Sequence, residues 1–305
     1  MMQSPLKTLD KINIEPRPVL NDITVVIPTL GRPILAESLY WIAANSAWPA
    51  DLIVVDQGAN PEVAVWLKML RSIGLRTQHI PSSQRGKAAA LNCGIKCVTT
   101  RFIVVTDDDC FVGVDWLKNM ATHLRQAPDA IITGPAEPEG DEVTVAAVTS
   151  HTKAIYRRPR LKFDTFCGSN MGVAITAIKQ IGLFDEDPVL VAAEDCEWSY
   201  RALRTGVPII YVPEIAVRHY SWRDKSKRVV RYKNYAQSHG GFYGKYLRKG
   251  DWFIGLRIII HHLRALRRWL YGLITGNQDS ALYGRAYLMG LLPGIIAGLR
   301  QGRKL

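Results

Sequence analysis

The sequence predicts an α/β fold, with a mostly parallel central sheet flanked by helices and a helical region at the C-terminal end. In the first third of the chain, short runs of β-branched residues alternate with segments of helical periodicity. This alternation is typical of right-handed βαβ units. With 305 residues, 48% of them hydrophobic, the chain can bury a sizeable core, and a mainly disordered protein is excluded.

Four strands and three helices are expected between residues 23 and 105. The strands cover residues 23–27, 52–55, 77–80 and 102–105, and the helices cover residues 34–44, a segment after Pro61, and residues 88–97. Residues 1–22 are polar and contain three prolines, so we expect an extension with little structure of its own. Residues 23–110 then form one half of a domain, and residues 111–220 form its second, less regular half.

Polar side chains follow three of these strands, at the point where each strand ends. Thr29 and Arg32 follow the first strand, Asp56 follows the second, and Asp107–Asp109 follow the fourth. Because the carboxyl ends of parallel strands meet at one edge of a Rossmann-like sheet, we expect these side chains to converge on a nucleotide. No GxxxxGK[ST] loop is present and no GxGxxG follows the first strand, which argues against P-loop enzymes and nicotinamide dehydrogenases.

The three consecutive carboxylates of Asp107, Asp108 and Asp109 are the most informative part of the sequence. Adjacent like charges are unfavourable unless a positive charge lies beside them. Carboxylate oxygens suit Mg²⁺ or Mn²⁺, and such an ion usually takes further ligands from the phosphates of a substrate. The trio therefore predicts a divalent metal site, and the alternative is an Asp-rich turn.

The second half of the domain carries two further groups of candidate residues. A run of small residues at 166–175 suits the close approach of a ligand and leads into a strand and a helix. A helix over residues 193–203 begins with Glu194 and Asp195, and His219 follows a strand at 209–212. Acids at a helix start also complement the helix dipole, and a lone histidine is often structural, so both alternatives stay open.

The basic excess of the chain lies in its C-terminal part. Residues 221–305 hold 17 Lys and Arg against 3 Asp and Glu, whereas residues 1–220 hold 22 against 24. A near-neutral body with a basic, aromatic and apolar tail favours an anionic membrane surface or phosphate-bearing substrates, and no nucleic acid is expected. No uninterrupted apolar run reaches the roughly 20 residues needed to span a bilayer. Helical stretches at 252–273 and 287–299 either pack on the body or lie on a membrane.

The cysteine content indicates a reducing compartment. Five cysteines are present, an odd number without metal-ligand spacing, and no apolar leader precedes them. We expect reduced thiols and a cytoplasmic location, with peripheral binding at the inner face of the cell membrane as an extension of that expectation.

Taken in order, these motifs resemble the family 2 glycosyltransferases, the large inverting group with the GT-A fold. The matching stretches are Val25–Thr29, Val54–Asp56, Gly86–Gly94, Asp107–Asp109, Gly168–Asn170, Gly182–Glu186 and the Glu194-Asp195 pair with Arg201 and Gly206. The resemblance covers residues 23–220. Each match alone is weak, but together they occur in the family's order.

The resemblance implies that the protein moves a sugar from a nucleotide-diphosphate sugar to an acceptor hydroxyl, with inversion. Asp195 would be the general base that removes the acceptor proton, and Glu194 would orient it or touch the acceptor. Asp109 and Asp107 would bind Mn²⁺ or Mg²⁺, with His219 as a further ligand, and Asp108 would face the ribose. The metal would neutralise the leaving diphosphate.

Further contacts are implied for the donor and for the acceptor. The donor nucleotide would be held by Pro28, Thr29, Arg32, Asp56, Arg85, Lys87, Asp107 and Asp108. The acceptor, a glycan, a polysaccharide or a lipid-linked sugar, would lie against Gly168, Ser169, Asn170 and Trp198. Basic loop residues that are merely solvated are the alternative for Arg32, Arg85 and Lys87.

Two departures from the family pattern refine this prediction. The processive synthases of the family carry a QxxRW motif, but the nearest stretch here begins with Ala265 and ends with Trp269, so we expect a single addition. The second strand ends in Asp56-Gln57-Gly58, where the family often has Asp-Asp-Gly. Two other classes remain as alternatives: a sugar-1-phosphate nucleotidyltransferase, and a non-catalytic basic protein that binds membrane or nucleic acid.

Overall fold

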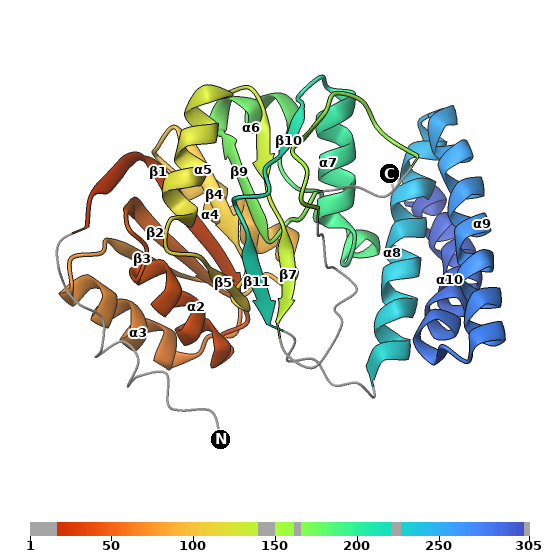
Figure 1. The fold of residues 1–305 in the computed structure, drawn as a ribbon, viewed down its shortest axis with the longest axis horizontal. Helices are drawn as coiled ribbons and strands as arrows, with labels where there is room; N and C mark the ends of the chain where they lie inside the picture. The colour runs from red at the N-terminus through yellow and green to blue at the C-terminus, as the bar shows by residue number, and fades with distance from the viewer. Residues whose placement is uncertain (1–16, 140–149, 162–165, 221–226, 302–305) are drawn as a thin grey trace. The chain divides into compact units, whose positions relative to one another are not determined.

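The computed structural model describes residues 17–139, 150–161, 166–220 and 227–301. Most of the extension expected over residues 1–22 lies outside these ranges. The chain divides into two compact units (Figure 1). Unit 1 comprises residues 1–159, 165–184 and 198–222, and unit 2 comprises residues 160–164, 185–197 and 223–305. All five cysteines are among the described residues, and none is in a disulfide.

Unit 1 is built on an eight-stranded sheet in the order β3-β2-β1-β4-β9-β6-β10-β8. Its strands are β1 (Val19–Thr29), β2 (Trp48–Asp56), β3 (Thr77–Pro81), β4 (Phe102–Thr106), β6 (Ile131–Thr133), β8 (Ala154–Tyr156), β9 (Asn170–Ala174) and β10 (Ile209–Tyr211). The pairs among β3, β2, β1 and β4 are parallel, as is the pair of β6 and β10. Strand β9 is antiparallel to both of its neighbours, and β8 is antiparallel to β10. The predicted mostly parallel sheet is confirmed.

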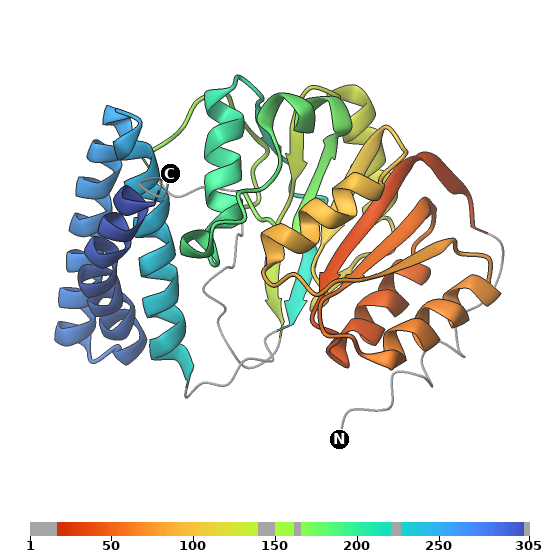
Figure 2. The same cartoon turned by 180° about the vertical axis from the view of Figure 1, so that it is seen from behind.

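Helices cover both faces of this sheet, as Figures 1 and 2 show from opposite sides. One face carries α2 (Ile34–Ala43), α3 (Pro61–Ser72) and α5 (Trp116–Gln126). The other carries α4 (Lys87–Cys97), α6 (Ile175–Ile181) and the part of α7 (Glu194–Arg204) that begins at Trp198. Side chains alternate across a strand, so Val25 packs in the first layer and Val26 in the second. The β-branched runs of the sequence are therefore central strands that are buried on both faces.

A second, three-stranded sheet in the order β5-β11-β7 carries part of the candidate site. Its strands are β5 (Cys110–Val112), β7 (Ala136–Glu139) and β11 (Val217–Tyr220). Strand β11 is antiparallel to β5, with His219 opposite Cys110. Strands of three or four residues are too short to show a period in the sequence, and none of these three was predicted.

The predicted elements of the first half are present, with two shifts at their ends. Strand β1 begins at Val19, inside the segment assigned to the extension, because it continues alongside β2, where Val19 pairs with Trp48. Strand β2 likewise begins at Trp48, before the predicted Leu52. In both cases the additional residues lie on the N-terminal side of the apolar run that indicated the strand.

In its described residues, unit 2 contains three long helices, a short 3-10 turn, η1 (Pro188–Leu190), and the first turn of α7. The helices are α8 (Arg228–Arg248), α9 (Trp252–Thr275) and α10 (Gln278–Arg300). The carboxylate of Asp251 caps α9 by accepting from the Phe253 amide, and Gly276 ends α9 in the left-handed conformation that favours glycine. The helix expected over residues 252–273 is confirmed, and α10 starts earlier than the apolar stretch at 287–299 suggested.

Glycines bring α8 and α10 into backbone contact. A Cβ atom added to Gly240 of α8 would overlap the carbonyl oxygen of Leu291, and one added to Gly294 of α10 would overlap that of Gln237. Gly244 and Gly298 make the same kind of approach one turn further along. This glycine seam, which we define as Gly240, Gly244, Gly294 and Gly298, leaves no room for side chains between the two helices.

Among the described residues, one helix is long and apolar enough to cross a membrane by length and composition, namely α10. Within its most apolar stretch, 39% is buried inside the fold. The sequence contained no uninterrupted apolar run of that length, because Asp279 and Arg285 lie within the helix. A helix that packs in the core of a soluble domain passes the same criterion, so this is weak evidence for a span.

Candidate active site

The end of β1 and the start of α2 surround the carboxylate of Asp108. Thr29 donates its hydroxyl to this carboxylate at 2.6 Å, and the Arg32 guanidinium donates from Nε at 3.2 Å and also from Nη2. On α2, Ser38 donates to the Asp108 carbonyl at 2.8 Å. This meeting follows from the parallel pairing of β1 with β4, which brings the two strand ends to the same edge of the sheet.

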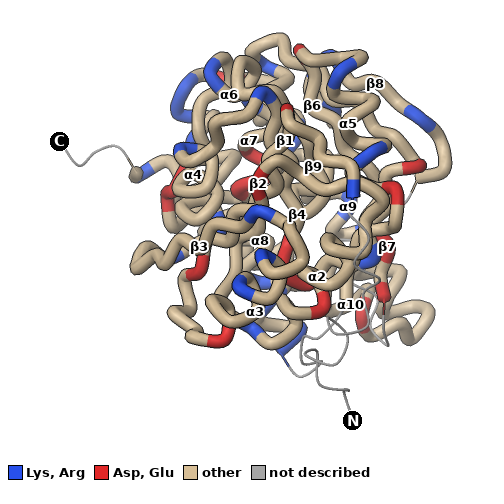
Figure 3. Tube along the Cα trace, turned by 90° about the vertical axis from the view of Figure 1, so that its left-hand side faces the viewer, with Lys and Arg blue, Asp and Glu red and all other residues tan. Residues whose placement is uncertain are grey.

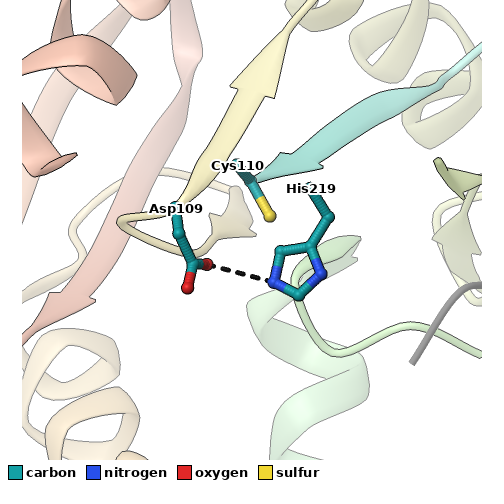
Figure 4. A group of neighbouring side chains, drawn as sticks. All are labelled: Asp109, Cys110 and His219. Carbon is teal, nitrogen blue, oxygen red and sulfur yellow. Dashed lines mark ion pairs between the residues drawn. The ribbon is translucent and has the colours of Figure 1, made fainter. Parts of the chain in front are cut away.

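Asp109 is shared between Arg32 and His219. The Arg32 Nη2 atom lies 3.2 Å from Oδ2 of Asp109, and the Nε2 atom of His219 lies 3.2 Å from Oδ1 (Figure 4). Both Asp109 and His219 are buried. Strand β11 holds the histidine in place, because the Tyr220 amide donates to the Asp109 carbonyl at 2.8 Å.

Asp107 pairs with the first residue of α4. The Lys87 ammonium lies 2.7 Å from Oδ2 of Asp107. Figure 3 marks the Lys, Arg, Asp and Glu positions along the chain; at this edge of the sheet the ion pairs are those of Arg32 and Lys87 with the Asp trio. Two protein cations thus stand beside the three carboxylates, so the charge of the trio is already partly balanced by the chain itself.

Burial controls the ionisation of this cluster. It raises the pKa of Asp108, while the adjacent Arg32 charge and hydrogen bond oppose the rise. Burial also raises the pKa of the Cys110 thiol well above its usual value, and the charges of Asp107 and Asp109 add to the rise. Cys110 points into the same space as Asp109 and His219 (Figure 4), but it stays a protonated thiol there.

The donor atoms present fit a hard divalent cation. Atoms of Asp109, Cys110 and His219 that could bind a metal lie within 4.8 Å of one another. Carboxylate oxygen suits both Mn²⁺ and Mg²⁺, and an imidazole nitrogen binds Mn²⁺ more readily than Mg²⁺, whereas a thiol held in its protonated form suits neither. Asp109 and His219 are therefore the fitting pair, and Cys110 is a neighbour.

Asp56 ends β2 and is fully buried. Its Oδ1 accepts from the Gly58 amide at 2.8 Å, and its Oδ2 lies 3.3 Å from Nε2 of His79 on β3. The amide of the Gln57 side chain donates to the Gly86 carbonyl at 3.0 Å and so ties this strand end to the start of α4. His79, Gln57 and Ser38 were not among the predicted site residues. The sequence signal for Gln57 was its replacement of the family's second Asp.

The structure does not support acceptor contacts for Asn170 and Trp198. Asn170 is fully buried, and its amide is engaged by the indole of Trp116 and by the carbonyls of Pro135 and Ile215. Trp198 is also fully buried, donates to the Gly182 carbonyl at 2.9 Å and stacks on Phe184. In this structure both side chains direct their polar atoms to partners inside the core, and the acceptor roles of Asn170 and Trp198 stay predictions.

The remaining predicted residues have mixed surroundings. Gly168 and Ser169 are buried before β9, where the Ser169 hydroxyl lies 2.9 Å from the Cys167 sulfur. Pro28 is buried inside β1. Arg85 is exposed in the loop before α4, and the ion pairs described above do not include it. The donor roles of Pro28 and Arg85 stay predictions.

Glu194 and Asp195 form the first turn of α7, which belongs to unit 2. Glu194 is buried, whereas Asp195 is partly exposed and accepts from the amide of Cys196. In the same unit Tyr246 donates to Glu197 at 2.7 Å, and Lys245 contacts Asp185 and Asp187. The first of these contacts ties α8 to the end of α7 that carries the acid pair, and the role of Asp195 as a base stays a prediction.

Comparison with known proteins identifies the family. Residues 24–182 match the family described as Glycosyl transferase family 2. The chain belongs to this family. The matched region spans the first strand, the Asp trio and the Gly182 turn, so it contains most of the site in unit 1. Membership in family 2 confirms the resemblance seen in the sequence.

Two curated relatives are described as glycosyltransferases. The pre-mycofactocin glycosyltransferase of Mycobacterium tuberculosis is 27% identical over 223 residues, which are 69% of this chain and 46% of that protein. The uncharacterized glycosyltransferase YwdF of Bacillus subtilis is 27% identical over 170 residues, 54% of this chain and 62% of that protein. The chain thus spans about half the length of the mycobacterial relative that it matches.

Solved structures show the GT-A fold. The mannosyltransferase PcManGT of Pyrobaculum calidifontis, solved with GDP-Man and Mn²⁺, aligns with a TM-score of 0.58 at 16% identity, covering 96% of this chain and 91% of the other. TarS 1–349 of S. aureus, solved with UDP, aligns with a TM-score of 0.54 at 14% identity, covering 87% and 90%. At this identity the likeness establishes the fold and leaves the substrates open.

Proposed function

We propose that this family 2 protein is a non-processive, inverting glycosyltransferase that moves one sugar from a nucleotide-diphosphate sugar to an acceptor hydroxyl. The observation that carries the proposal is the convergence of Thr29, Arg32 and Lys87 on the carboxylates of Asp107–Asp109 at the carboxyl edge of the sheet. Unrelated loops bring these groups together, and an Asp-rich turn alone would not require such partners. Solved relatives of this fold that hold GDP-Man or UDP support a nucleotide donor.

The chemistry requires one bond to break and one to form at the anomeric carbon. The acceptor oxygen bonds to that carbon from one face, while the bond from the carbon to the diphosphate breaks on the other face. The acceptor proton passes to a carboxylate, which we assign to Asp195 because it is the second acid of the Glu194-Asp195 motif. Glu194, the preceding residue, is buried, and we assign it the role of orienting this base.

A divalent cation, Mn²⁺ or Mg²⁺, would be held by Asp109 and His219, with Asp107 as a further ligand. When bound, such an ion neutralises charge on a leaving diphosphate. Arg32 and Lys87 contribute positive charge from the protein at the same edge and contact the donor phosphates. Asp56 and Thr29 bind the nucleoside. The Asp108 carboxylate contacts both Thr29 and Arg32 and so stabilises the loop between β1 and α2.

The acceptor is proposed to be a glycan, a growing polysaccharide or a lipid-linked sugar. Replacement of the glutamine of the processive motif by Ala265 supports transfer of a single sugar. The basic excess in residues 221–305 supports a location at the inner face of the cell membrane, with the protein in the cytoplasm.

Donor binding and turnover test the proposal separately. Calorimetric titration of the protein with GDP- and UDP-sugars is expected to show binding with Mn²⁺ or Mg²⁺ that is lost with EDTA and in Asp109→Asn. Asp195→Asn is expected to keep donor binding but to lower release of nucleoside diphosphate by about 10²–10⁴-fold, the usual contribution of a general base.

The exposed Asp129 provides the matched control, because Asp129→Asn removes the same charge away from the site and leaves both measurements unchanged. Donor binding that is equally tight with EDTA and in Asp109→Asn would overturn the metal site. Full turnover in Asp195→Asn would overturn the assignment of the base and leave the donor site standing.

A further inference from the structure

A basic cavity lies between α9 and α10 in unit 2. Its volume is about 680 Å³, and the side chains that define its chemistry are Arg264, Arg267, Arg268, Tyr271, Ser280 and Tyr283. The two helices lie side by side in both Figure 1 and Figure 2. None of these residues belongs to the proposed sugar-transfer site, and the family match ends at residue 182, before the cavity begins.

The cavity has the donors that phosphate groups require. Three guanidinium groups and the hydroxyls of two tyrosines and a serine line it. Arginine binds phosphate oxygens through two parallel N–H bonds, and tyrosine and serine add neutral donors. Arg268 is already positioned, because its guanidinium lies 4.0 Å from the centre of the Tyr283 ring.

Within α9 and α10, the two helices that border the cavity, the acid content is one residue. Helix α9 contains four arginines and no Asp or Glu. The one acid in the first turn of α10, Asp279, already accepts from Arg228 at 2.9 Å and from the Tyr232 hydroxyl at 2.7 Å. The arginines of the cavity therefore present their positive charge to a ligand.

An apolar stripe runs along α9 next to the cavity. The exposed residues Leu256, Ile259, Leu263, Leu266, Leu270 and Leu273 follow one another at intervals of three or four positions, which places them on one side of the helix. Arg264 and Arg267 each follow a stripe leucine by one position, roughly 100° further round the helix, so they lie at the edge of the stripe that borders the cavity. Trp252, 77% exposed, begins the stripe.

We propose that this cavity binds the phosphate or diphosphate headgroup of a membrane lipid, while the α9 stripe lies in the surface of the bilayer. Apolar side chains on one face with arginines along its edge are typical of helices that lie in a membrane interface. The proposal concerns unit 2 alone and is independent of the sugar transfer assigned to unit 1.

The observations favour a lipid over the other occupants of such a surface. Nucleic acid offers phosphates but nothing to cover an apolar stripe of this length. A second copy would bring together two segments that each hold 17 basic and 3 acidic residues, which is repulsive. An anionic lipid offers a phosphate to the arginines of the cavity and acyl chains to the leucines of the stripe.

Co-sedimentation of the full chain with vesicles tests the proposal. The vesicles contain phosphatidylcholine alone, or phosphatidylcholine with phosphatidic acid or with phosphatidylserine at equal surface charge. Binding is expected to be strongest to phosphatidic acid, because its phosphate monoester is accessible to the arginines. Arg267→Gln and Arg268→Gln, both at exposed positions, are each expected to weaken this binding about tenfold.

Arg300, at the other end of α10, provides the matched control: Arg300→Gln removes one charge without touching the cavity and is expected to bind as the wild type does. Equal binding to phosphatidic acid and phosphatidylserine, weakened as much by Arg300→Gln as by Arg267→Gln, would overturn the cavity as the site. Circular dichroism of each variant verifies that the helices are intact.

Inorganic pyrophosphate separates the two sources of phosphate. It is expected to compete with vesicles for the wild type, and Leu263→Gln with Leu266→Gln is expected to lose vesicle binding while pyrophosphate binding remains. Tight binding of pyrophosphate without any binding to vesicles would assign the cavity to a soluble phosphate compound and overturn the lipid.

Discussion

At the scale of single residues, the Asp trio is balanced by protein cations from two different elements. Arg32 forms ion pairs with both Asp108 and Asp109, and Lys87 forms an ion pair with Asp107. Two of these carboxylates are only 2% exposed, so their charges are poorly solvated. Arg32 therefore stabilises the folded site itself, in addition to any contact that it makes with a substrate.

Replacing Arg32 should therefore cost stability. In Arg32→Gln the two buried carboxylates lose their shared cation, and we expect the free energy of unfolding to fall by about 1–3 kcal/mol, less than for a fully buried pair because Arg32 is 24% exposed. Denaturation in urea measures this change. The control is Arg76→Gln, which removes a 75% exposed arginine that lies 3.4 Å from Asp51 and is expected to cost between zero and about 1 kcal/mol. Equal losses in the two variants would contradict a special role for Arg32.

The sequence located the charged half of the site but not its buried polar half. Thr29, Arg32 and Lys87 were predicted because polar residues at strand ends and helix starts converge in a wound sheet. The buried hydrogen bonds of Asn170 were not predicted, because its partners, Trp116 and the carbonyls of Pro135 and Ile215, come from segments far apart in the chain. Hydrogen bonds of that kind leave no periodic trace in a sequence.

At the scale of elements, the glycine seam decides how α8 and α10 pack. Its glycines occur four positions apart on each helix, and the facing backbones occupy the space in which side chains would lie. Small residues at this spacing allow helices to approach closely in membranes, and the same geometry operates here. The sequence showed a Gly-rich apolar stretch in α10, but the partner helix could not be inferred from it.

One methyl group on this seam should be destabilising. Gly294→Ala places a Cβ against the Gln237 carbonyl, which must move, and we expect a loss of about 1–3 kcal/mol in the free energy of unfolding. Gly255→Ala in α9 is the matched control, because a Cβ there meets nothing within 4 Å. Alanine is the better helix former, so the control is expected to gain about 0.5–1 kcal/mol. If Gly294→Ala unfolds at the same urea concentration as the wild type, α8 and α10 accommodate the methyl group without loss of stability, and the prediction is contradicted.

At the scale of the whole molecule, the two units differ in charge and in how far the sequence revealed them. The alternation of strands and helices predicted the sheet of unit 1, whereas unit 2 appeared only as a basic, amphipathic region. Residues 185–197, which include the Glu194-Asp195 pair, belong to unit 2 although the sequence placed them in the second half of the sheet domain. Such a division depends on contacts with α8, which a pattern of single residues cannot show.

Unit 2 also contains two buried histidines, which should make its stability depend on pH. Burial lowers the pKa of His239 to about 4 and that of His261 to about 2, with Arg257 adding to both shifts and the charge of Asp195 opposing the first. The Tyr287 hydroxyl lies 3.2 Å from Nδ1 of His239, and the Tyr243 hydroxyl lies 3.2 Å from Nδ1 of His261. Both histidines are therefore neutral in the folded state at pH values where the unfolded chain is protonated.

Because these folded-state pKa values are depressed, the stabilisation is present above pH 6.5 and is lost as the pH falls. We expect the free energy of unfolding to drop by about 1.4 kcal/mol per pH unit for each histidine below pH 6.5. Urea denaturation between pH 7 and pH 5 measures the slope. His261→Gln is expected to reduce the slope, and His151→Gln, at an exposed position, is expected to retain it. An unchanged slope in His261→Gln would contradict the assignment.

The short strand β11 offers a way to observe the candidate site by NMR. Its last residue, Tyr220, donates its amide to the carbonyl of Asp109, the residue that also faces His219. The resonance of this amide in a nitrogen–proton NMR spectrum therefore reports on the backbone of Asp109, to which it is joined by one hydrogen bond. A shift of this resonance would report the binding of a metal ion or a donor nucleotide at Asp109. The measurement needs no chromophore and no knowledge of the acceptor.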